Sequence, residues 1–490
     1  MRLRWGWRRR AWLALGLGLA GAGAPAEGQA LTACRLQGVE HEALCGSVSR
    51  ALDPAQQHGA RIELHFAVLP ALARHKKPDP VFFLAGGPGQ SAIALAGPVS
   101  RMLARFGQRR DIVLVDQRGT GRSAPLDCGD EPAHRPLREQ ADPQRQVQRA
   151  RSCLKQLQAL PHGDLRHYTT TVAMQDLDAV RQALGAADIN LVAASYGTRA
   201  ALEYMRLYPN HVRRVVLDGV APADMALPEA SAPDAQAAFD ALLQACALEP
   251  ACQARHPGLR QQWQALLAAL PRSVSVAHPL TGRSEELLLT RDMLLAMVRT
   301  ALYLPLTASA LPAAIAEAAA GRFGPLVGLS SAHGPARGAS ALAQGMHFSV
   351  VCAEDLPAGG AGAAPAADFG QGLAPLYREI CAFWPRGEPP AGFRQLPPAV
   401  APTLLLSGGI DPATPPRHGE RVAGALGAKA RHQIVPNAGH GLMGLPCMRD
   451  VVFRFVDAAD DVQALQVDAG CARQIPRPPV FVPPGEGAAP

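Results

Sequence analysis

The sequence lacks the features by which several classes of protein are recognised. After the first 26 residues, no run of about 18 uninterrupted apolar residues occurs, so no later segment is expected to cross a membrane as a helix. Beyond the arginine-rich start, no block of about five or more like charges is present, which argues against a nucleic-acid partner. The cysteines include no C-x-x-C pair and no His/Cys cluster of the zinc type. We therefore expect no metal and no cofactor.

The first 26 residues have the composition of an export signal. An arginine-rich start is followed by an apolar run over residues 11–23 and by small residues at Ala24 and Ala26, a spacing that suits signal peptidase. Five of the seven net positive charges lie in this segment, so a chain that starts at Glu27 carries only +2. We expect a periplasmic or extracellular protein without stable membrane insertion after cleavage. An uncleaved membrane anchor is the alternative.

The cysteines agree with export into an oxidising compartment. They fall into five local pairs, namely Cys34 and Cys45, Cys128 and Cys153, Cys246 and Cys252, Cys352 and Cys381, and Cys447 and Cys471. Closeness along the chain favours a disulfide within each pair, although many other connectivities are possible. Buried free thiols are the alternative.

Short β-branched runs alternate with stretches of helical period in the first half of the chain. The expected strands are 61–69, 81–84, 111–115, 189–194 and 212–217, and the expected helices are 171–184 and 198–208. The strand pattern returns at 403–406 and 433–435 and is followed by a helical pattern over 448–462. This alternation predicts an α/β fold with a mostly parallel sheet that is flanked by helices on both faces.

The middle of the chain is rich in alanine and leucine and has no comparable series of strands. We interpret it as a mainly helical cap domain that is inserted into the sheet domain. The expected organisation is a signal peptide over 1–26, the first part of the core over 27–221, the cap over 222–398, the second part of the core over 399–475, and a Pro/Gly-rich tail over 476–490.

A candidate nucleophile, Ser195, lies where a predicted strand ends and a helix begins. A serine hydroxyl is a poor nucleophile unless it projects from a sharp turn toward a base, and such a turn needs small residues two positions before and after the serine. Ala193 and Gly197 meet this need, although Ala193 stands where glycine is usual.

The stretch Leu84-Ala85-Gly86-Gly87-Pro88-Gly89 follows another predicted strand. Acyl transfer creates an oxyanion, which requires backbone N–H donors from a loop that allows close approach. Gly87 is one candidate donor and the N–H of Tyr196 is the second. A simple turn or a phosphate-binding loop is the alternative, but the glycine spacings of phosphate-binding loops are missing.

An acid and then a base are expected further along the chain. Asp411 follows the predicted strand 403–406, and His440 follows the last predicted strand with a glycine on either side. Both positions lie at the edge of the sheet where catalytic loops gather. Asp218, at the end of the predicted strand 212–217, is the rival acid.

Together these motifs resemble the α/β-hydrolase family of proline iminopeptidases and secreted tripeptidyl aminopeptidases. The similar stretches are Gly86 to Gly89, Asp116-Gln117-Arg118-Gly119-Thr120-Gly121-Arg122-Ser123, Ser195 to Thr198, Leu217-Asp218-Gly219, and Pro402 through Asp411 and His440 to Cys447. The resemblance covers about residues 80–220 and 400–471, and it implies the α/β-hydrolase fold. It also implies that Ser195 is the nucleophile, that His440 is base and then acid, and that Asp411 orients the imidazole. Members often carry histidine where this chain has Ala85, so the support of the oxyanion loop is expected to differ.

The substrate depends on whether the protein binds a free ammonium group. An aminopeptidase needs carboxylates at a fixed distance from its serine, and the family places them in the cap. Glu354 and Asp355 are the candidates, and a helix start with two solvated acids is the alternative. The expected function is a secreted serine aminopeptidase that releases proline or a di- or tripeptide from peptides with a free N-terminus. A carboxylesterase or lipase-like hydrolase of the same fold, and a non-catalytic binding protein, are the other hypotheses.

Overall fold

The structure is a computed structural model that describes residues 31–481 apart from 57, 130–131, 133, 141, 333–341 and 357–366. The predicted signal peptide over 1–26 and the last part of the predicted tail, 482–490, lie outside the described residues. None of the helices in the described part of the chain combines the length and the apolar character that a membrane span requires.

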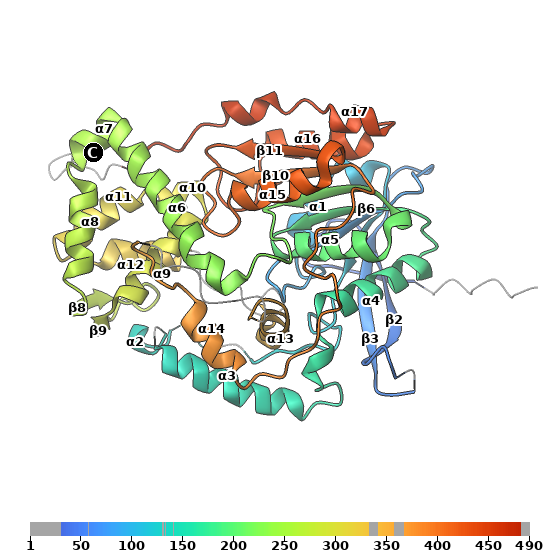
Figure 1. The fold of residues 1–490 in the computed structure, drawn as a ribbon, viewed down its shortest axis with the longest axis horizontal. Helices are drawn as coiled ribbons and strands as arrows, with labels where there is room; N and C mark the ends of the chain where they lie inside the picture. Colours follow the sequence, from blue (N-terminus) through green and yellow to red (C-terminus); the bar gives the residue numbers. More distant parts are fainter. Residues whose placement is uncertain are drawn as a thin grey trace, which may run out of the picture.

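In the described residues, nine strands form one central sheet in the order β1-β2-β3-β5-β4-β6-β7-β10-β11 (Figure 1). Their bounds are β1 Thr32–Cys34, β2 Ala43–Ala51, β3 Arg61–Leu69, β4 Val81–Leu84, β5 Ile112–Val115, β6 Ile189–Ala194, β7 Val212–Asp218, β10 Thr403–Gly408 and β11 Ala430–Val435. The pairs from β1 to β5 are antiparallel, and those from β5 through β4, β6, β7 and β10 to β11 are parallel. The predicted α/β fold with a mostly parallel sheet is confirmed.

The central strands consist of continuous runs of apolar residues because helices cover both of their faces. On β4, Val81 and Phe83 belong to the core that includes α1 and α16, whereas Phe82 and Leu84 belong to the core that includes α4, α5 and α15. The helices of the sheet domain are α1 Ala96–Met102, α3 Pro143–Gln158, α4 Thr170–Ala183, α5 Tyr196–Leu207, α15 Pro416–Leu426, α16 Pro446–Asp457 and α17 Asp461–Leu465, and a short helix, α2, spans Leu137–Gln140. This sandwich fixes the carboxyl ends of the parallel strands, from which the candidate residues project.

Between β7 and β10 the chain leaves the sheet and forms a separate group of elements, seen on one side of the sheet in Figure 1. These are α6 Leu227–Leu248, α7 Pro250–Arg255, α8 Leu259–Ala268, β8 Arg272–Ala277, β9 Ser284–Leu289, α9 Arg291–Leu302, α10 Pro305–Ala308, α11 Leu311–Ala319, α12 Gly324–Ser331, α13 Gln344–Glu354 and α14 Ala374–Cys381. The group has its own core around Phe239 and Trp263, whose ring centroids lie 4.7 Å apart. The antiparallel pair β8–β9 is not predicted from the sequence. The domain boundaries at 222 and 398 stay predictions.

All ten cysteines are paired, and the five predicted disulfides are confirmed. The alternative of free thiols is therefore wrong. The bridge Cys352–Cys381 joins α13 to α14, and Cys447–Cys471 ties the start of α16 to the segment that follows α17.

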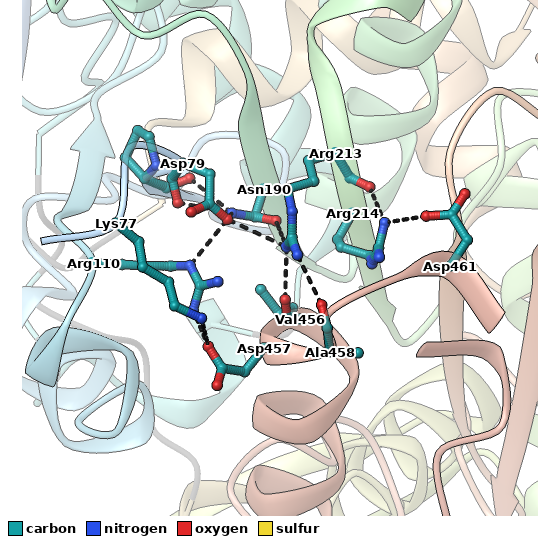
Figure 2. Close-up of polar contacts among 11 residues, drawn as sticks. Lys77, Asp79, Arg110, Asn190, Arg213, Arg214, Val456, Asp457, Ala458 and Asp461 are labelled. Carbon is teal, nitrogen blue, oxygen red and sulfur yellow. Dashed lines mark hydrogen bonds and ion pairs between the residues drawn. The ribbon is translucent and has the colours of Figure 1, made fainter. Parts of the chain in front are cut away.

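A network of ion pairs lies at the amino ends of the parallel strands (Figure 2). Ser195 follows the carboxyl end of β6 and so lies at the opposite edge of the sheet. Arg110, which precedes β5, is buried, and its guanidinium contacts Asp79 Oδ2 at 3.0 Å and Asp457 Oδ1 at 2.6 Å. Arg213 on β7 donates to the backbone carbonyls of Val456 and Ala458 at 2.7 and 2.9 Å. The network therefore attaches the end of α16 to the sheet.

Replacing Arg110 with methionine is expected to lower the free energy of unfolding by about 1–3 kcal/mol, because two carboxylates lose a buried partner. This loss of stability is smaller than for a buried carboxylate that has no second partner. Asp79 still pairs with Arg213 at 3.2 Å, and Asp457 still pairs with Lys77. Urea denaturation measures the change. The matched control is Arg260→Met, which removes an exposed pair with Asp240 and is expected to change stability by less than about 0.5 kcal/mol. Equal effects of the two variants would contradict a stabilising role of the network.

Candidate active site

Ser195 occupies a strained turn between β6 and α5, with φ 55° and ψ −127°. A non-glycine residue rarely adopts a positive φ, and such strain is typical of a serine that is presented at the end of a strand. A Cβ on Gly197 would lie 2.3 Å from Leu84 O, so only glycine fits there. Ala193 is fully buried within β6, and its methyl group is accommodated.

The imidazole of His440 is paired with the carboxylate of Asp411, with 2.8 Å between Nδ1 and Oδ2. Asp411 follows β10 and is buried, and it also accepts hydrogen bonds from the N–H groups of Ala413 and Thr414 and from the Thr414 hydroxyl. Because an ionised carboxylate can only accept, Nδ1–H of His440 is the donor, and Nε2 of the neutral ring carries no proton.

The charges of this pair support each other. Burial disfavours the carboxylate of Asp411, but the neighbouring His440 and the two backbone N–H groups outweigh burial, and the pKa of Asp411 is lowered. Burial likewise disfavours the imidazolium of His440, but Asp411 and then Asp218 outweigh it, and the pKa of His440 is raised. The pair therefore holds an ionised acid next to a base that accepts a proton readily.

The end of β7 connects the serine turn to the histidine. The N–H of Ser195 donates to the carbonyl of Asp218 at 2.8 Å. The next residue, Gly219, lies against the imidazole, because a Cβ on it would be 3.2 Å from His440 Cε1. The structure thus brings Ser195, Asp411 and His440 to the carboxyl ends of β6, β10 and β11, and β7 lies between β6 and β10 in the sheet.

Asp218, the rival acid, has a different role in the structure. Its carboxylate accepts hydrogen bonds from the N–H groups of Leu442 and Met443 at 2.8–2.9 Å. These bonds hold the segment that follows His440. Burial raises the pKa of Asp218 to about 6. The structure places Asp411, and not Asp218, on Nδ1 of the imidazole.

The glycine loop after β4 lies directly against the turn that carries Ser195. A Cβ on Gly86 would be 3.0 Å from Ser195 Cβ, and Gly87 has a φ of 110° that suits glycine alone. Tyr196 is the first residue of α5, so its N–H lies at the amino end of that helix. On the core side, Asp116 accepts hydrogen bonds from the Ser91 hydroxyl at 2.6 Å and the Ile93 N–H at 3.1 Å, and these bonds hold the end of the loop.

Glu354 and Asp355 lie at the carboxyl end of α13 and are 0% and 1% exposed. The alternative of a helix start with two solvated acids is therefore wrong. Glu354 accepts hydrogen bonds from the N–H and the hydroxyl of Thr170 at 2.6 and 2.8 Å, and Asp355 Oδ1 accepts one from Arg199 at 2.7 Å. Burial raises the pKa of Glu354 to about 7 and also raises the pKa of Asp355.

Residues 79–444 match the model of the alpha/beta hydrolase fold family. The chain belongs to this family. The α/β-hydrolase fold that the resemblance implies is thereby confirmed.

Curated relatives of this α/β hydrolase include peptidases. The chain is 33% identical over 192 residues to the tripeptidyl aminopeptidase of Streptomyces lividans, and the match covers 36% of this chain and 35% of the relative. The chain therefore matches only about a third of that relative's length. The chain is 26% identical over 416 residues to the serine protease Hip1 of Mycobacterium tuberculosis, covering 78% of this chain and 79% of the relative. The chain also matches the solved structure of a proline iminopeptidase from Mycobacterium smegmatis, with 17% sequence identity and a TM-score of 0.36. This match covers 86% of this chain and 100% of the iminopeptidase chain.

Several polar residues of this α/β hydrolase site are not predicted from the sequence. The Thr414 hydroxyl contacts both Asp411 and His440. The sequence could have predicted its contact with Asp411, because a threonine three residues after an aspartate can cap a turn. Arg199 and Thr170 contact the acids of α13 and carry no sequence motif. In the described part of the chain, no group of three or more His, Cys, Asp or Glu side chains is arranged to bind a metal ion.

Proposed function

We propose that this α/β hydrolase is a serine aminopeptidase that acts on peptides with a free N-terminus. The observation that carries the proposal is the Asp411–His440 hydrogen bond at the carboxyl edge of the sheet, beside the strained turn of Ser195. The relatives named as an aminopeptidase and a protease support a peptide substrate.

The proposed reaction passes through an acyl-enzyme. Ser195 Oγ attacks the carbonyl carbon while Nε2 of His440 takes the hydroxyl proton, and the N–H groups of Gly87 and Tyr196 stabilise the resulting oxyanion. The carbon–nitrogen bond then breaks as His440 donates the proton to the leaving amine. Water attacks the ester in the same way, and its proton returns through His440 to Ser195.

The acids of the cap support recognition of an ammonium group. Both oxygens of Glu354 are bonded to Thr170, whereas Asp355 Oδ2 and Glu229 Oε2 are buried without a hydrogen-bond partner among the described residues. Burial raises the pKa of Glu229, a backbone hydrogen bond of its own residue and Arg378 lower it, and Asp355 raises it, with a net increase. An ammonium group has three donors and would satisfy such oxygens. Asp355 with Glu229 is therefore the proposed amine site. Glu354, the other predicted candidate, supports it through Arg199, whose Nη1 lies 3.4 Å from Glu354 Oε2 and 2.7 Å from Asp355 Oδ1.

Asp355→Asn is expected to raise KM for a tripeptidyl chromogenic amide about 10–100-fold, because a hydrogen bond to a charged group is lost. Hydrolysis of a simple ester is expected to be nearly unchanged, and N-acetylation of the amide should abolish cleavage by the wild type. The matched control is Asp368→Asn, a buried cap aspartate that bonds Trp263. Equal losses on ester and amide would contradict the amine site. Indifference of the wild type to acetylation would favour a carboxylesterase.

Export of the protein is part of the same proposal. Five disulfides in one chain are typical of proteins that fold in an oxidising compartment. A peptidase in the periplasm or outside the cell would meet peptide substrates there.

A further inference from the structure

The first turn of cap helix α13 contacts the loop that carries Gly87. The N–H of Ala343, just before the helix, donates to Gly89 O at 2.9 Å. One turn further, Nδ1 of His347 lies 3.1 Å from Pro88 O. The Leu342 side chain packs on the same loop, since its Cδ1 lies 2.8 Å from a Cβ placed on Gly87. The cap therefore holds two consecutive carbonyl groups of the loop.

The hydrogen bonds of His347 have one possible direction. A carbonyl oxygen can only accept, so Nδ1–H donates to Pro88 O. Nε2 then accepts a hydrogen bond from the hydroxyl of Tyr377 on α14, at 2.7 Å. His347 is 7% exposed, and burial lowers its pKa to about 4, so the ring is neutral near pH 7 and keeps this arrangement. The result is an ordered chain of donors from Tyr377 through His347 to the loop.

The loop is thus held from two sides. Asp116 holds it on the core side through Ser91 and Ile93, after the glycines. His347 and Ala343 hold it on the cap side, at Pro88 and Gly89. Gly87 precedes the two held carbonyls, so their direction limits the orientation of its N–H. A donor that is displaced from the oxyanion loses most of its effect on the rate.

The other end of α13 contacts the segment of the second donor. Glu354 accepts a hydrogen bond from the Thr170 hydroxyl, and Thr170 Oγ1 in turn lies 2.7 Å from the hydroxyl oxygen of Tyr196. Asp355 pairs with Arg199, one turn after Tyr196 on α5. One cap helix therefore touches, at its two ends, both segments that supply the proposed oxyanion donors.

We infer that His347 is a positioning residue for the oxyanion loop, and that helix α13 of the cap completes the oxyanion hole. His347 acts through Pro88 O and does not touch the reacting atoms. The inference rests on the proposed serine-hydrolase function. It predicts that loss of the His347 ring weakens stabilisation of the transition state more than binding of the substrate.

The test compares His347→Leu with His347→Asn, on a tripeptidyl chromogenic amide and on p-nitrophenyl acetate. His347→Leu is expected to lower kcat about 10–100-fold on both, with KM within about threefold, because the oxyanion forms with either substrate. His347→Asn keeps a donor near the Nδ1 position and should recover most of the loss. The matched control is His256→Leu at the end of α7, which is equally buried at 7% and should leave kcat unchanged.

A second readout separates positioning from loss of structure. The affinity for a peptide boronic acid, whose tetrahedral adduct places an oxygen in the oxyanion hole, should fall by the same factor as kcat. If His347→Leu does not fold, Tyr377→Phe decides, with an expected two- to tenfold lower kcat at unchanged KM.

Three outcomes would overturn the inference. These are a kcat of the folded His347→Leu protein within twofold of the wild type, a change confined to KM, or a His347→Asn protein as slow as His347→Leu. If His347→Leu does not fold, an unchanged kcat of Tyr377→Phe would overturn the inference. A wild type that cleaves neither substrate overturns the proposed function as well, whereas an active wild type with an unaffected His347→Leu overturns this inference alone.

Discussion

Replacing Ser195 with alanine is expected to lower kcat by at least ~10³-fold and to leave the fold intact. The hydroxyl is the proposed nucleophile, and without it the Asp411–His440 pair has no group to activate. The backbone of the turn should survive, because its hydrogen bonds use main-chain groups: Ser195 N–H donates to Asp218 O, and Thr198 N–H donates to Ser195 O. Alanine also has no greater difficulty than serine with the positive φ of this position.

Turnover of a tripeptidyl chromogenic amide measures this loss, and labelling by a fluorophosphonate probe gives an independent check. Wild-type protein should be labelled at Ser195, and the variant should not. Ser275→Ala, on the exposed face of β8, is the matched control and should behave as the wild type. Near-native turnover of the Ser195 variant would contradict the assignment. Absence of labelling in folded wild-type protein would favour a non-catalytic binding protein.

Replacing Asp411 with asparagine is expected to lower kcat about 10²–10⁴-fold. An asparagine amide can donate to Nδ1, which would leave the proton on Nε2 and block its action as a base. The pH profile should also change. Neutral His440 is the active form, so activity falls as the pH drops through its pKa, which Asp411 holds above the ordinary value against burial. Without the carboxylate, burial lowers that pKa, and the acid limb of the residual activity should move to lower pH.

Asp218→Asn is the matched control for this change, because it alters the rival acid in the same way. Asparagine can still accept a hydrogen bond from Leu442 or Met443, so a much smaller loss of kcat is expected. Profiles of kcat against pH for the two variants decide between the acids. A loss at Asp218 as large as at Asp411, or an acid limb that stays in place in Asp411→Asn, would show that Asp411 is not the partner of the imidazole.

The buried parallel strands could be predicted because both of their faces are apolar. The structure has the parallel strands β4 and β6 at the predicted bounds, and the antiparallel strand β3 as well. In contrast, β2 has no apolar run, since it is partly exposed along most of its length and carries Ser47, Ser49 and Arg50. The predicted helix over 448–462 is in fact two helices. Ala458 has an extended ψ of 140°, and the Asp460 side chain caps the second helix by accepting the N–H of Gln463.

The candidate site could be predicted where residues follow strands, because strand ends meet at one edge of a sheet. Ser195, Asp411 and His440 are of this kind. The supporting contacts are different, because they join segments far apart in the chain: 184 positions separate Thr170 from Glu354, and 259 separate Pro88 from His347. No local pattern in the sequence records such a contact.

The insertion of the cap between β7 and β10 also sets the order in which a ribosome completes the site. The turn of Ser195 leaves the ribosome first, then every helix of the cap, and only afterwards Asp411 and His440. A nascent chain that stops inside the cap lacks the strands β10 and β11 and with them the proposed acid and base. The proposed site is therefore complete only after the last part of the chain has been made and has folded, in an exported protein after export, so that these two strands join the free edge that β7 offers.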